Sequence, residues 1–119
     1  MPYDVELANK VRAFLAEIDD LAVEEKEMFS VLNFMVNGKT CVCVSGYKLM
    51  LRFDPKRQEE LYEWSGYETM LMKGKEYKGY CYINPEGFRN STDLAFLLQL
   101  CLDYNKISKK SKKKRASDP

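Results

Sequence analysis

The sequence contains no histidine. Histidine is the commonest general base and a frequent metal ligand, and the usual serine and cysteine triads depend on it. No stretch of about 18 apolar residues is available to cross a bilayer, and the chain does not open with a secretory leader pattern. Among its glycines, Gly74 and Gly79 fit neither the Walker nor the dinucleotide-binding spacing. These absences predict a non-enzymatic, cytoplasmic protein without cofactor, metal site or membrane contact.

The four cysteines, Cys41, Cys43, Cys81 and Cys101, all lie within apolar runs. Such a setting is typical of buried free thiols, which persist in a reducing cytoplasm. The two-residue spacing of Cys41 and Cys43 matches neither a redox pair nor half of a zinc site. We therefore expect all four side chains to serve packing.

The net charge of +1 hides two regions of opposite sign. Residues 1–105 hold 12 Lys and Arg against 17 Asp and Glu, which gives −5, whereas residues 106–119 hold 7 against 1, which gives +6. This predicts an acidic domain over residues 1–105 and a disordered basic tail over residues 106–119. The tail can either bind nucleic acid weakly and without sequence preference or act only as a solubilising segment. Its candidate contacts are Lys109, Lys110, Lys112, Lys113, Lys114 and Arg115.

Three segments are predicted to be helices, the first and the third from the apolar periodicity of amphipathic helices and the second from its capping sequence. The first covers residues 4–18, with Asp4 as its N-cap and Phe14 on its apolar stripe. The second covers residues 54–64 and begins with Asp54-Pro55, an N-cap followed by proline at the first helical position. The third is capped by Ser91 or Thr92 and continues to about residue 105.

Between these helices the periodicity is that of strands. Residues 26–53 alternate in the manner of a meander of three or four strands, with a hairpin turn at Asn37-Gly38 and a second turn at Ser45-Gly46. Two further strands are expected over residues 68–72 and 79–83, joined by a loop. The order of helix, three or four strands, helix, two strands and helix predicts an α+β fold, an antiparallel sheet with flanking helices.

Four separated segments resemble the N-terminal domain of TfoX-like (Sxy-like) proteins: residues 26–29, 34–42, 49–52 and 79–87. The resemblance covers residues 1 to about 105 and implies a small α+β domain similar to YjbR-like and secretion-chaperone-like folds. It also implies a regulatory role, because TfoX proteins act in natural competence as coactivators with a cyclic-AMP receptor protein. Two features depart from the family pattern: Ser30-Val31 stands in place of a Gly-Gly pair, and a basic tail stands in place of a helical C-terminal domain.

The binding candidates are Met28 and Phe29, within the first of these segments, and Arg52, which ends an apolar strand. Arg52 can hold a carboxylate or a ligand, although an ordinary charge on an edge strand or at a strand end is the favoured interpretation. We expect a non-enzymatic regulatory module that meets a protein partner, such as the transcription machinery, through its sheet or a helix groove, and a homodimer is compatible with this. The alternatives are nucleic-acid binding through the tail and a small-ligand-binding or enzyme-like domain around Arg52.

Overall fold

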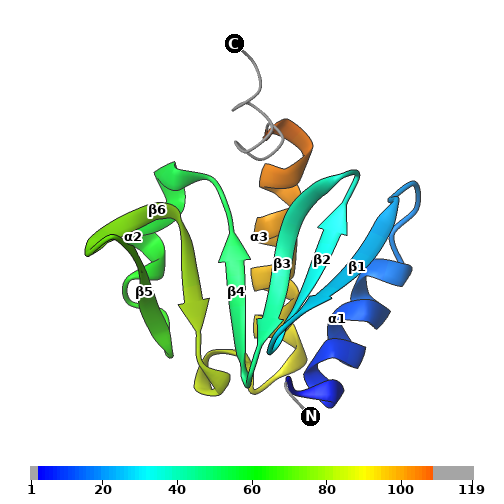
Figure 1. Ribbon diagram of the computed structural model, residues 1–119, viewed down its shortest axis with the longest axis horizontal. Helices are drawn as coiled ribbons and strands as arrows, with labels where there is room; N and C mark the ends of the chain where they lie inside the picture. The colour runs from blue at the N-terminus through cyan, green and yellow to red at the C-terminus, as the bar shows by residue number, and fades with distance from the viewer. Residues whose placement is uncertain (1–2, 109–119) are drawn as a thin grey trace.

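A computed structural model describes residues 3–108 of the chain. It shows an α+β fold in which one antiparallel sheet of six strands is covered by helices, as the sequence predicts (Figure 1). The elements are α1 (Val5–Ala16), β1 (Val23–Met28), β2 (Val31–Val36), β3 (Lys39–Ser45), β4 (Lys48–Arg52), the 3-10 turn η1 (Pro55–Arg57), α2 (Gln58–Leu61), β5 (Tyr67–Met72), β6 (Lys75–Ile83), the 3-10 turn η2 (Pro85–Phe88) and α3 (Ser91–Ile107).

The strand order is β1-β2-β3-β4-β6-β5, so the sheet is a simple meander only as far as β4. The segment η1–α2 then carries the chain past one strand position, β5 forms the edge, and β6 returns between β4 and β5. The backbone N–H of Phe53 donates to the carbonyl of Gly79 at 2.9 Å, which extends the pairing of β4 with β6. A tight turn at Lys73-Gly74 replaces the expected loop, and β6 begins at Lys75.

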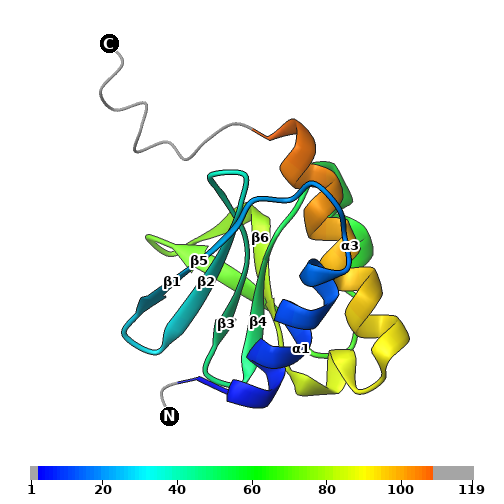
Figure 2. The ribbon, with the colours of Figure 1, turned by 90° about the vertical axis from the view of Figure 1, so that its right-hand side faces the viewer.

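One face of the sheet carries α1 and α3, whereas no described element covers the other, the open face (Figure 2). Phe34, Val42, Leu51 and Cys81 are neighbours in register across four adjacent strands, and all four are buried in the core beneath the helices. Side chains of a strand alternate between the two faces. Within each strand, the residues that alternate with these core positions therefore lie on the open face.

Side-chain caps fix the starts of the helices. Asp4 is the N-cap of α1, as predicted, because its Oδ1 accepts from the backbone N–H groups of Glu6 and Leu7 at 3.0 and 3.2 Å. Asp54 caps η1 in the same way, through the N–H of Lys56 at 3.0 Å. The predicted cap of the last helix is wrong: Asn90, not Ser91 or Thr92, accepts from the N–H of Asp93 at 2.8 Å.

The helices also differ in length from the prediction. α1 ends at Ala16, earlier than expected, and its buried stripe includes Ala8 and Leu15, which leaves Phe14 only half-buried. The second helix is one 3-10 turn followed by a single short α-helix ending at Leu61. The earlier end of α1 and the shortening of the second helix have the same reason. Most of the stability of a helix in a protein comes from its packing, so the helices form only where they contact the sheet.

α3 continues to Ile107, so Lys106 and Ile107, which the prediction placed in the tail, are helical. The Nζ of Lys39 donates to the carbonyls of Asn105 and Ser108 and thus holds the end of α3 on the sheet. The six candidate tail contacts from Lys109 to Arg115 lie outside the described residues, and nucleic-acid binding through them stays a prediction. Among residues 3–108, no helix is long and apolar enough to cross a membrane.

Candidate functional site

Met28 and Phe29 lie at the turn between β1 and β2. Met28 is more than half exposed, and Phe29 is 95% exposed with a φ of +50°. The left-handed region is unusual for a bulky side chain. The carbonyl of the next residue, Ser30, accepts from the N–H of Gly46 at 3.2 Å, which brings this turn beside the turn that carries the exposed Tyr47. The two turns form an exposed apolar tip of the sheet.

Arg52 lies at the opposite end of the sheet from this tip. It ends β4, four residues from Lys48, a separation of about 13 Å along a strand. Its guanidinium stands over the ring of Tyr104 in α3, 5.5 Å from the ring centroid, and approaches the carbonyl of Thr40 at 3.5 Å. The structure therefore does not bring Arg52 together with Met28 and Phe29, and Arg52 helps to join the sheet to α3.

The open face of the sheet gathers every methionine of the described chain. Met28 is opposite Val31, and Met50 is opposite Cys43, in positions that alternate with the buried core residues. Met35 lies on the same face of β2. In β5, Glu68 is paired with Tyr82, which is also on this face, and Met70 and Met72 follow Glu68 at intervals of two residues and so share its face. Methionine side chains are flexible and polarisable, and surfaces rich in them adapt to different partners.

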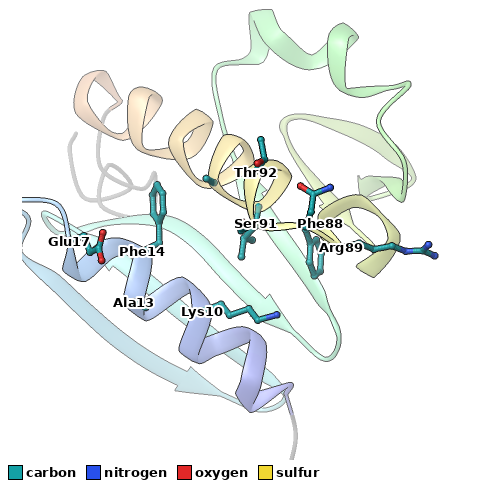
Figure 3. A pocket seen from close by; sticks show the side chains of 11 residues that line it. Lys10, Ala13, Phe14, Glu17, Phe88, Arg89, Ser91 and Thr92 are labelled. Carbon is teal, nitrogen blue, oxygen red and sulfur yellow. The ribbon is translucent and has the colours of Figure 1, made fainter.

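A groove of about 710 Å³ separates α1 from the beginning of α3 on the helix-covered side (Figure 3). Phe14 rises from α1 toward α3, and Phe88 projects from η2 toward Lys10. Both rings are only half-buried, and Ala13 and Leu94 complete an apolar floor. The size and apolar lining are typical of a binding site.

Charged side chains mark the two ends of this groove. Lys10 and Arg89 lie at one end and Glu17 at the other. Within residues 3–108, neither cation forms an ion pair, although Glu6 lines a smaller hollow of about 230 Å³ next to them. An occupant with a negative end near Lys10 and a positive end near Glu17 would match this arrangement.

The thiols are not reactive groups. All four cysteines are free and buried, as predicted. Burial raises the pKa of Cys41, Cys43 and Cys81 to about 12 and that of Cys101 well above its usual value. They are therefore protonated at neutral pH and poor nucleophiles. In the described part of the chain, no three or more Cys, Asp or Glu side chains are grouped so that they could hold a metal ion.

None of the three predicted binding residues lines the groove. The sequence predicted that Phe14 lies on the apolar stripe of the first helix, and no pattern in it indicated a role for Phe88-Arg89. The one sequence signal for the groove was that Lys10 and Phe14 lie on the same helix. The opposite wall comes from residues more than 70 positions later in the chain. Only the packing of α1 beside α3 brings the two walls together.

Comparison with known proteins identifies a family. The model of the TfoX N-terminal domain family matches residues 14–104, more than three quarters of the chain. The match agrees with the resemblance drawn from the sequence. No curated protein and no solved structure matches the chain.

Proposed function

We infer, since the chain belongs to the TfoX N-terminal domain family, that it is a non-enzymatic module that regulates by binding another protein. The groove between α1 and α3 carries this proposal, because it exposes two phenylalanine rings and two cations without an ion-pair partner within residues 3–108. Leaving aromatic rings partly in water lowers stability unless a partner covers them. A cytoplasmic location, which keeps the four thiols reduced, belongs to the same proposal.

The shape and charge of the groove fit an amphipathic helix. From Lys10 to Glu17 the α1 wall is about 10 Å long, the length of two helical turns. Helices commonly carry acidic residues in the first turn and basic residues in the last, in accord with the helix dipole. Such a helix would place its acidic end at Lys10 and Arg89, its basic end at Glu17, and its apolar stripe on Phe14 and Phe88.

The regulatory part of the proposal rests on the family. TfoX proteins act with a promoter-bound regulator, so we propose that the partner belongs to the transcription machinery. The small-ligand and enzyme-like alternative has less support, because Arg52 packs against Tyr104 and the thiols are protonated.

The proposal is tested by a photo-crosslinking amino acid placed at Ala13, in the groove, in cells that naturally produce the protein. We expect one discrete adduct, whose yield falls at least several-fold when Arg89→Glu reverses one of the two positive charges at that end of the groove. The matched control carries the probe at Glu59, an exposed position in α2, and should give no adduct. An adduct at both positions, or at neither, contradicts the binding groove, and an adduct with a protein unrelated to transcription contradicts the regulatory part.

A further inference from the structure

One stripe of α1 carries opposite charges at its two ends. Lys10, Ala13 and Glu17 follow each other at intervals of three and four residues and therefore share one face of the helix. All three are exposed, whereas Val11 and Leu15, on the opposite side of the helix, are buried against the sheet. Within residues 3–108, neither Lys10 nor Glu17 forms an ion pair. Both charges therefore face outward and are available to a second molecule.

This stripe is complementary to itself when it is turned around. Lys10 and Glu17 are seven residues apart, about 10 Å along the helix. In an antiparallel pair of α1 helices, Lys10 of each copy lies opposite Glu17 of the other, and the two-fold axis passes beside Ala13, which lies between them. A parallel pair would instead place like charges together. The charge pattern therefore selects a second copy of the chain, in the antiparallel orientation.

Ala13 allows the two helices to approach closely. Packed helices lie about 8 to 10 Å apart, depending on the side chains at the contact, so a methyl group at the axis permits the shorter distance. Phe14, next to Ala13, projects into the groove between α1 and α3 (Figure 3). When α1 packs against α1, the groove of one copy faces the groove of the other. The half-buried rings of Phe14 and Phe88 in the two copies then cover each other.

We propose that the free chain is a homodimer in which α1 packs antiparallel against α1 of a second copy, with the two grooves facing each other. This contact hides the groove that a partner helix would occupy, so dimer and partner exclude each other. The masking rests on the proposed function, whereas the dimer itself does not. Two helices of 12 residues supply only part of the roughly 800 Å² that each partner commonly buries in a stable interface. The groove walls must supply the rest, and a partner helix that binds them can displace the second copy.

Two charge reversals test the pairing, because each should fail alone and the two should succeed together. In Lys10→Glu, both ion pairs of the dimer become contacts between two acidic side chains, and in Glu17→Lys they become contacts between two basic ones. Each variant alone should dimerise with a dissociation constant at least tenfold higher than that of the unmodified chain. In an equimolar mixture, one copy of each variant restores both ion pairs. We expect this heterodimer to match the affinity of the unmodified dimer in sedimentation analysis with one variant fluorescently labelled.

Charge reversals away from the stripe provide the matched controls. Lys56→Glu and Glu59→Lys change exposed positions of η1 and α2, and each should leave the dissociation constant unchanged. The unmodified chain should sediment at twice its mass of 13.9 kDa. A monomer at the highest soluble concentration overturns the proposal. A dimer that neither stripe variant weakens, or a mixture of the two stripe variants that stays monomeric, overturns it as well.

The crosslinking probe at Ala13 separates failure of the dimer from failure of the proposed function. In cells, an adduct of two copies has twice the mass of the chain and supports the dimer, whereas an adduct with a different protein reports the partner. A purified chain that is monomeric, together with a partner adduct in cells, overturns the dimer alone. A purified chain that is dimeric, without any partner adduct in cells, overturns the proposed function alone.

Discussion

At the scale of single residues, the buried Gln58 joins α2 to the sheet through two hydrogen bonds. Its Oε1 accepts from the backbone N–H of Gly79 at 2.7 Å, and its Nε2 donates to the hydroxyl of Tyr67 at 2.9 Å. Gln58→Leu would leave the N–H of Gly79 buried without an acceptor. We expect the free energy of unfolding to fall by about 2 kcal/mol, measured by urea denaturation.

A second glutamine provides the matched control for this prediction. Gln99 is exposed on α3 and donates only to Asp103 of the same helix. Gln99→Leu should change the free energy of unfolding by no more than about 0.5 kcal/mol. Equal losses in the two variants would show that the bonds of Gln58 contribute nothing beyond those of a surface glutamine.

At the scale of elements, three neighbouring residues are candidates for the N-cap of α3. The side chain of Asn90 accepts from the N–H of Asp93, whereas local sequence preference favours Ser91 or Thr92. Asn90→Ala should lower the free energy of unfolding by about 1 kcal/mol, because one backbone donor at the start of the helix loses its partner. Thermal or urea unfolding provides the measurement.

Ser91→Ala is the appropriate comparison, since it changes the neighbouring residue on the same turn. Ser91 is exposed and already inside the helix, so its loss should cost no more than about 0.5 kcal/mol. A larger loss from Ser91→Ala than from Asn90→Ala would contradict the observed start of α3. It would instead support Ser91 as the N-cap, as sequence preference predicts.

At the scale of the whole molecule, the buried thiols make stability depend on pH. In the unfolded chain a thiol ionises with a pKa of about 8.5, whereas in the folded protein burial raises the pKa of Cys43 to about 12. The folded state then binds more protons between these values, so stability is lost as pH rises above about 8.5. The slope is at most about 1.4 kcal/mol per pH unit for each thiol.

Cys43→Ala should therefore reduce the dependence of the free energy of unfolding on pH between about 9 and 11. The reduction should approach the slope of one thiol, measured by urea denaturation at several pH values. Ser45→Ala, in the same strand, removes a hydroxyl that does not titrate and should leave the slope unchanged. An unaltered slope in Cys43→Ala would mean that its thiol ionises equally in the folded and unfolded chains.

Local chemistry made several features predictable. Asn37-Gly38 forms the hairpin turn with φ values of +52° and +80°, as a type I′ turn requires. Asp4 and Asp54 act as caps because their short side chains reach backbone N–H groups two or three residues away. The alternating burial along β2 and β4 matches the two-residue period that the sequence shows over residues 26–53.

The amino-acid sequence by itself determined the α+β class, the turns at Asn37-Gly38 and Ser45-Gly46, the family and the burial of the thiols, because these depend on neighbouring residues and on composition. Only the tertiary structure decided the position of β6 between β4 and β5, the groove between Phe14 and Phe88, and the separation of Arg52 from Met28 and Phe29. Each of these depends on contacts between residues far apart in the chain, which no local periodicity encodes. The physical reason is that packing chooses which faces meet after the elements have formed.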